Sequence, residues 1–210
     1  MPIDPSSPFP SGPASPDTAL ALVEAHLLTV LGQDSGRAGV TFLGAGRIDV
    51  LRFGPDDDGL VRYVTVGMSR EPMTSAASAV VDPSGPRAEL VLSLHGTQDK
   101  VLKALAALAS SPTVDGVVIA PGASLAVGEP LWPGGRAEAV LVAEPGGLIP
   151  DLDLGDAFPD AAPVQFLPVL PLLPEEAAYK RIHGAAALEE RWLATGTDLR
   201  NPFRRAVPLL

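Results

Sequence analysis

Two short glycine patterns are the first places where this sequence could do chemistry. Gly44-Ala45-Gly46-Arg47 starts like a glycine-rich dinucleotide loop, whose glycines allow the backbone to approach a pyrophosphate. The third glycine is absent, and Arg47 leads into a β-branched segment where that loop would open a helix. Gly67-Met68-Ser69 starts like a nucleophile elbow, but no closing glycine follows, and Glu71-Pro72 stands where a helix should begin. The residues favour a turn at the first position and a strand end at the second.

Three consecutive aspartates, Asp56, Asp57 and Asp58, form the densest carboxylate cluster in the chain. A calcium loop needs ligands at alternate positions and a distal glutamate, and neither is present here. Gly54-Pro55 precedes the cluster and Gly59 follows it, which is the composition of a solvated hairpin turn. We expect these three aspartates to contact a partner protein rather than a metal ion.

The histidines and the paired glutamates also lack the spacing of a reactive site. His26, His95 and His183 stand far apart, so they form no metal-ligand pattern, and we expect structural roles at element ends for the last two. Glu175 and Glu176 are neighbours at a helix start, where they suit the positive end of the helix dipole better than an acid/base pair. We therefore expect no catalytic residue, metal ligand or cofactor, although side chains distant in sequence could converge on one.

Composition limits the partners of the chain. Its 210 residues fit one domain, and a hydrophobic content of 46% supports a core without disulfides, which the absence of cysteine excludes. The net charge of −10 opposes nucleic acid and anionic membranes, because binding phosphate depends on lysine and arginine. A basic protein would instead be attracted. With aromatic residues at only 5%, a surface that stacks bases is also disfavoured.

The N-terminus predicts neither export nor a membrane anchor. Residues 1–16 hold six prolines and four serines but no basic segment followed by an apolar run, so they do not resemble a signal peptide. We expect a disordered leader there and one domain over residues 17–210. No apolar run reaches the roughly 18 residues that a membrane helix needs. The expected location is the cytoplasm.

Periodicity predicts the elements that must position any site. Apolar residues recur at helical spacing over 17–31, with Ser15 as a cap, and again after Thr97, which we expect to cap a second helix that ends at Ser110-Ser111-Pro112. A third helix should open at Pro174 and end before Gly184. Strands are expected at residues 40–43, 47–53, 60–68, 87–94, 117–120, 138–143 and 164–172.

The interleaved elements predict an α+β fold: a single domain with a mixed, largely antiparallel central sheet flanked by helices. The segments 47–53 and 60–68 should form a hairpin around the aspartate turn, and the partial alternation in Arg62-Tyr63-Val64-Thr65-Val66 indicates one wetter face. The nearly apolar 87–94 should be a central strand. Near the C-terminus, Tyr179 and Trp192 are expected in the core. The basic segment 200–205 is expected to fold back onto acidic surface or to contact a partner.

Several short motifs resemble the suppressor of fused family. Phe166-Leu167-Pro168-Val169-Leu170-Pro171-Leu172-Leu173-Pro174-Glu175-Glu176-Ala177-Ala178-Tyr179-Lys180, followed by Leu188-Glu189-Glu190-Arg191-Trp192, is similar to the C-terminal signature of that family. Tyr63-Val64-Thr65-Val66-Gly67-Met68-Ser69 and Arg87-Ala88-Glu89-Leu90-Val91-Leu92 resemble its central strands. Asp198-Leu199-Arg200 resembles its terminal Asp/Arg segment. The resemblance covers residues 41–200.

The resemblance implies a mixed α/β domain that binds protein and has no enzymatic step. In animals, such a domain joined to a second one sequesters a transcription factor of the Hedgehog pathway by taking its peptide as an added strand. Bacterial domains of this kind are proposed to be immunity proteins that neutralise secreted toxins. We therefore expect a cytoplasmic module that binds another protein, such as a basic toxin. Two alternatives stay open: a small hydrolase or ligand-binding enzyme, and a scaffold that pairs through an exposed sheet edge.

Overall fold

The computed structural model describes residues 15–78 and 80–209. Most of the expected N-terminal leader, residues 1–14, lies outside the described residues. The first described element is α1 (Pro16–Leu31), which begins as the sequence predicts: the Ser15 hydroxyl accepts a hydrogen bond from the Thr18 N–H at 3.2 Å, and Pro16 occupies the first turn.

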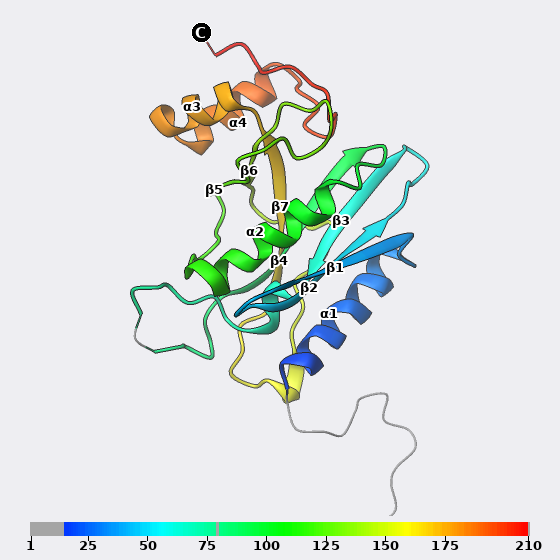
Figure 1. Ribbon diagram of the computed structural model, residues 1–210, viewed down its shortest axis with the longest axis vertical. Coiled ribbons are helices and arrows are strands. Elements are labelled where there is room, and N and C mark those ends of the chain that lie inside the picture. The colour runs from blue at the N-terminus through cyan, green and yellow to red at the C-terminus, as the bar shows by residue number, and fades with distance from the viewer. Residues whose placement is uncertain (1–14, 79, 210) are drawn as a thin grey trace, which may run out of the picture.

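A seven-stranded mixed sheet forms the centre of the fold, in the order β1-β2-β3-β4-β7-β6-β5 (Figure 1). Neighbouring strands are antiparallel except for β4 and β7, which run parallel. The predicted α+β class and the central position of β4 are therefore confirmed. The strands are β1 (Gly36–Phe42), β2 (Gly46–Phe53), β3 (Leu60–Val66), β4 (Arg87–His95), β5 (Ser124–Ala126), β6 (Ala139–Val142) and β7 (Val164–Leu172).

The two long helices cover opposite faces of this sheet. Ile48 and Tyr63 pack on the side of α2 (Val101–Asp115), whereas Leu51 and Val64 pack on the side of α1, as the two-residue period of a strand requires. The expectation of a wetter face on β3 is wrong at Thr65, which is fully buried. Both faces of β3 are buried because each lies under a helix.

The boundaries of α2 differ from those predicted. Thr97 does not cap this helix, which begins at Val101 after Lys100 and has no side-chain cap. Nor does Pro112 end it, and the helix continues to Asp115. A proline at this position cannot donate to the Leu108 carbonyl, but the Ser111 hydroxyl donates to that oxygen at 2.7 Å. The missing backbone bond is thus locally replaced.

The predicted strand at residues 117–120 is also wrong. This segment is irregular, and its one wholly buried residue is Ile119, whose N–H donates to the Met73 sulfur at 3.4 Å. Ile119 therefore packs against a loop, whereas Val117 and Val118 are exposed and pair with no strand. The pairing with β6 is supplied by β5, a little further along the chain.

The two faces of the sheet under α1 and α2 each hold a hydrophobic core. A third, smaller core lies at the end of the molecule that holds the C-terminus (Figure 1). There β7 leads into α3 (Pro174–His183), which is followed by α4 (Ala185–Ala194), and Leu172, Leu188 and Trp192 pack together with Val207. The predicted core position of Trp192 is confirmed. Two short 3-10 helices, η1 (Met68–Arg70) and η2 (Gly155–Ala157), complete the secondary structure. None of the helices in the described part of the chain combines the length and apolar character that crossing a membrane requires.

Candidate functional site

The predicted aspartates lie in the β2–β3 turn, but they do not act alike. Asp56 is committed to the turn: Oδ1 accepts from the N–H groups of Asp58 and Leu60, and Oδ2 accepts from Arg62 at 2.8 Å. The Leu60 N–H, followed by Arg62, lowers the pKa of Asp56 below its ordinary value. Asp57 and Asp58 are exposed, so these two remain available for contact with a partner.

The sheet opens into a fork between its two parallel strands. The β4–β7 ladder runs from Arg87 opposite Val164 to Val91 opposite Pro168 and goes no further. The next ladder bond on this path would join the Ser93 N–H to the Val169 carbonyl, and the bond after it would need an N–H at residue 171, which is a proline and has none. Pro171 therefore prevents the ladder from resuming further along, whereas the break itself lies one bond earlier, between Ser93 and Val169.

Pro168 has the corresponding effect on the other edge of β7. The Ala143 N–H donates to the Pro168 carbonyl at 2.8 Å, but Pro168 cannot return a bond, and β6 ends at Val142. Pro168 thus limits the pairing of β7 with β6, and Pro171 removes the donor that β7 would need to pair with β4 beyond that point. The result is a strand that is central in the sheet over part of its length and unpaired on one edge beyond Val169.

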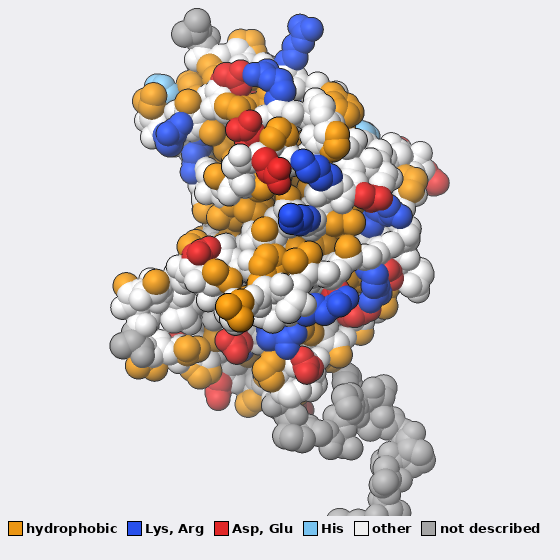
Figure 2. All heavy atoms as spheres, viewed as in Figure 1, with side chains coloured by type: hydrophobic (Ala, Val, Ile, Leu, Met, Phe, Trp, Pro, Cys, Tyr) orange, Lys and Arg blue, Asp and Glu red, His pale blue; other side chains and the backbone are white. Residues whose placement is uncertain are grey.

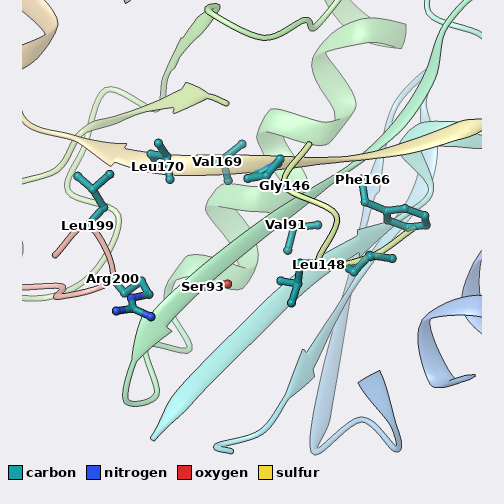
Figure 3. A pocket seen from close by; sticks show the side chains of 11 residues that line it. Val91, Ser93, Gly146, Leu148, Phe166, Val169, Leu170, Leu199 and Arg200 are labelled. Carbon is teal, nitrogen blue, oxygen red and sulfur yellow. The ribbon is translucent and has the colours of Figure 1, made fainter. Parts of the chain in front are cut away.

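Apolar side chains line a hollow of about 80 Å³ at this fork, and Figure 3 shows them converging from both strands. Val91 and Ser93 come from β4, and Phe166 and Val169 come from β7. The loop at 146–149 crosses the opening and contributes Leu148, which is 48% exposed. Because backbone groups alternate along a strand, the Ser93 N–H points to the same side as that of His95, into the fork.

The C-terminal segment closes the outer end of the fork. The Arg200 carbonyl accepts from the His95 N–H at 2.8 Å, and Arg204 donates to the Pro171 carbonyl at 2.8 Å. Asp198 holds this segment from the side, because its carboxylate contacts His95 Nε2 at 3.0 Å and Arg200 Nε at 3.0 Å. Partial burial opposes ionisation of Asp198, but the hydrogen bonds from Arg200 and the nearby positive charges keep its pKa below the ordinary value.

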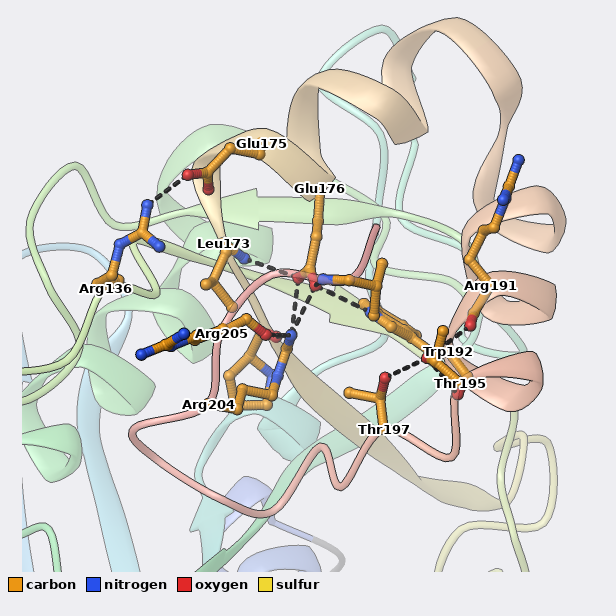
Figure 4. A network of polar contacts seen from close by, with 12 residues as sticks. Arg136, Leu173, Glu175, Glu176, Arg191, Trp192, Thr195, Thr197, Arg204 and Arg205 are labelled. Atoms are coloured by element: carbon orange, nitrogen blue, oxygen red, sulfur yellow. Dashed lines mark hydrogen bonds and ion pairs between the residues drawn. The ribbon is translucent and has the colours of Figure 1, made fainter. Parts of the chain in front are cut away.

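Glu176 anchors the same segment from within the small core (Figure 4). It is fully buried, and its two oxygens accept from Arg204 Nη1 and Nη2 at 2.6 and 2.7 Å. The Trp192 indole N–H and the N–H groups of Leu173 and Val207 donate to the same carboxylate. The prediction that Glu176 is a helix-end charge is therefore incomplete, since this carboxylate joins α3, α4 and the C-terminal segment.

The charge of Glu176 is maintained by its partner. Burial alone would raise the pKa of this carboxyl, but the hydrogen bonds and charge of Arg204, with the Trp192 and Leu173 donors, bring it below the ordinary value. The prediction that the basic segment 200–205 folds back onto acidic groups is confirmed at Arg204. By contrast, Glu175 is exposed and pairs with Arg136 on the surface.

The elbow-like Gly67-Met68-Ser69 is part of a buried structural network. The Ser69 hydroxyl donates to Glu89 at 2.6 Å, and Glu89 also accepts from the Thr65 hydroxyl at 2.6 Å and the Gly67 N–H at 2.8 Å. Ser69 and Glu89 are both fully buried, so this serine is not presented to a substrate. Within residues 15–78 and 80–209, no cluster of three histidine, aspartate or glutamate side chains is arranged to hold a metal ion.

The comparisons with known proteins agree with this architecture. The family described as suppressor of fused protein matches residues 44–205, which is most of the chain and includes both strands of the fork. The chain belongs to the suppressor of fused family. No match is found among curated proteins.

Solved structures of suppressor of fused proteins share the fold. A homolog from Neisseria gonorrhoeae aligns with a TM-score of 0.67 at 18% identity, over 90% of this chain and 96% of that one. A structure described as the Sufu-Fu complex gives 0.62 at 15% identity, over 92% of both chains. Drosophila Suppressor of Fused gives 0.61 at 16% identity over 97% of this chain, which spans 53% of that protein.

Sequence reasoning recognised the stretch that forms the fork but not the fork itself. The available signal was the pair of prolines in β7, because proline inside a strand marks an edge that lacks a ladder. Which strand would lie beside that edge was not readable, since β4 and β7 are separated by about seventy residues. The suppressor of fused chain thus carries its candidate site at a place where two distant segments diverge.

Proposed function

We propose that this chain is a non-enzymatic protein-binding module of the immunity type, which takes an extended segment of a basic partner at the fork between β4 and β7. The observation that carries the proposal is an interrupted ladder beside an apolar hollow. The Ser93 N–H and the Val169 carbonyl face this gap without a partner strand. An added strand gains affinity from such main-chain groups and specificity from the side chains that line the hollow.

Two further observations support a protein as the ligand. A relative in the same family was solved as the Sufu-Fu complex, a complex between proteins. The C-terminal segment, which satisfies His95 and Pro171, would be displaced or extended by an incoming strand without disturbing the β4–β7 ladder.

Charge supports a basic partner in a specific way. The chain carries a net charge of −10, yet positive and negative side chains are interspersed on the face shown in Figure 2. The net negative charge therefore acts as a general field that raises the rate of association with a basic protein. Local contacts with that protein are made by exposed groups such as Asp57 and Asp58. The turn that holds these aspartates reaches the end of β4, because the Gly96 N–H donates to the Gly59 carbonyl.

The test is affinity capture from a native lysate with the wild-type chain and the Ser93→Pro variant. The Ser93 N–H has no partner strand in the free protein, so proline there removes no ladder bond but blocks one with an added strand. We expect one stoichiometric basic protein, lost at high salt and lost in Ser93→Pro. Ser93→Ala, which removes only the hydroxyl, should capture normally.

Two outcomes would reject the proposal in different ways. Equal capture by a folded Ser93→Pro variant would remove the fork from the interface. Absence of any partner, together with turnover in a broad substrate screen, would favour the enzyme alternative. The double variant Asp57→Lys/Asp58→Lys serves as the charge control, and we expect it to reduce capture chiefly at low salt.

A further inference from the structure

A second site stands at the opposite end of β4 and is independent of the fork. Arg87 is the first residue of β4, six residues before Ser93, which places the two about 20 Å apart along an extended strand. Arg87 is only 7% exposed and lines a surface cavity of about 220 Å³ that is open to solvent. The other walls are Pro83 and residues 157–161, which start at the last residue of η2 and include Phe158.

The hydrogen bonds of Arg87 engage only one of its three guanidinium nitrogens. Nη1 donates to the main-chain carbonyls of Ser69 and Arg70 at 2.8 and 3.0 Å. Nε is buried and has no hydrogen-bond partner, and Nη2 makes no hydrogen bond to the described part of the chain. Nη2, the guanidinium nitrogen that solvent can reach, is therefore the donor that remains for one oxygen of a carboxylate.

The positive charge of Arg87 has no directly paired carboxylate in the described part of the chain. Among the described residues, no carboxylate is hydrogen bonded to Arg87 or forms an ion pair with it. Burial lowers the pKa of Arg87, and the charge of Glu71 raises it without a direct contact. A buried cation without a paired anion is costly to maintain, so a ligand that supplies the anion would bind with a favourable electrostatic contribution.

We propose that the cavity beside Arg87 is a binding site for a monocarboxylate with a small apolar body. The single guanidinium supplies the polar contact, and Pro83, Phe158 and Pro159 supply apolar walls. Asp160 at the wall disfavours ligands with a second negative charge, so phosphate and dicarboxylates fit less well. The carboxylate is either that of a free small acid or that of a polypeptide C-terminus.

Butyrate is the probe for the first source and N-acetyl-L-alanine for the second, each titrated into the full chain at constant ionic strength and followed by backbone amide NMR shifts. We expect saturable shifts at Pro83-flanking residues and at 157–161 with the acids, and none with butyramide or N-acetyl-L-alanine amide. Tighter binding of N-acetyl-L-alanine identifies a chain terminus as the ligand. Tighter binding of butyrate identifies a free acid.

Variants separate this site from general charge effects. Arg87→Gln should weaken binding by at least about tenfold, because a charged hydrogen-bond donor is lost. Arg181→Gln, at an exposed arginine on α3, is the matched control and should leave affinity unchanged. Asp160→Asn should tighten binding by about twofold to threefold, as expected for loss of a nearby like charge.

Ala157→Phe gives a test that leaves Arg87 untouched, since Ala157 is exposed and its larger replacement fills the cavity. We expect it to abolish saturable binding while the amide spectrum stays folded. Any of three results overturns the proposal: no saturable shift with either acid, equal binding of the neutral amides, or unchanged acid affinity in Ala157→Phe.

Discussion

Two buried arginines, Arg204 and Arg87, show how the same side chain can be structural in one region and available in another. The Arg204 side chain is 6% exposed and binds Glu176 through two nitrogens, so its charge is compensated inside the chain. Arg87 is 7% exposed as a whole residue but donates only to the carbonyls of Ser69 and Arg70. A buried cation with its own carboxylate fixes the fold, whereas one without it leaves a position for a ligand.

The largest effect should follow removal of the compensated cation. Arg204→Met leaves Glu176 buried without its countercharge, and we expect the free energy of unfolding to fall by about 3–5 kcal/mol. Urea unfolding followed by Trp fluorescence measures this loss. The double variant Arg204→Met/Glu176→Leu should lose less than the sum of the two single variants, because no unpaired charge remains. Additive losses would contradict the assignment of this pair as one unit.

Acid should weaken the same pair in the wild-type protein. The pKa of Glu176 is lowered in the folded state, so its contribution is complete above the ordinary value of 4.5 and is lost as pH falls through the lower folded pKa. We therefore expect the stability difference between wild type and Glu176→Gln to shrink below about pH 4.5. Melting temperatures of both proteins across the acid range provide the measurement. A constant difference would show that the pKa of Glu176 is the same in the folded and unfolded states.

Glu89 is a buried carboxylate without an arginine and refines the comparison. Its oxygens accept from Ser69, Thr65 and the N–H of Gly67, so neutral donors replace the countercharge. Glu89→Gln places an amide donor against these donors, and we expect a loss of about 2–3 kcal/mol, smaller than for Arg204→Met. Urea unfolding under the same conditions measures whether Glu89→Gln loses less free energy of unfolding than Arg204→Met. A larger loss for Glu89→Gln than for Arg204→Met would contradict the expected ranking of the two carboxylates.

Arg87→Met should have the smallest effect on stability. It removes two hydrogen bonds but also relieves a buried charge that has no paired carboxylate, so we expect a change within about 1 kcal/mol. Differential scanning calorimetry at neutral pH, with Arg181→Met as the surface control, measures it. A loss as large as that of Arg204→Met would mean that Arg87 is structural in the same way.

The fork adds a second lesson about what local patterns contain. The sequence predicted a strand that leads into a helix at Pro174, and this junction is confirmed. It also contained Pro168 and Pro171, which remove one ladder donor from each edge of β7. It did not reveal that β4, about seventy residues earlier, would lie beside that unpaired edge. The sequence therefore predicted one wall of the candidate site, which is β7. The other wall, β4, depended on the order of strands in the sheet.

Local signals determined most of the elements, because capping, periodicity and turn composition act over a few residues. The sequence alone determined α1 with its Ser15 cap, the β2–β3 hairpin and the resemblance that the family match confirms. It misjudged α2, since a Ser111 hydroxyl replaced the bond that Pro112 removes, and it mistook the irregular segment around the buried Ile119 for a strand.

Tertiary structure alone decided which charges are buried and which are compensated. Glu176 and Arg204 are 28 residues apart and Arg87 meets Ser69 across 18, so no local pattern could assign their partners. Burial turns an ordinary helix-start glutamate into an anchor for the C-terminal segment, because a charge removed from water requires a specific partner. The same requirement, left unmet at Arg87, marks the second site.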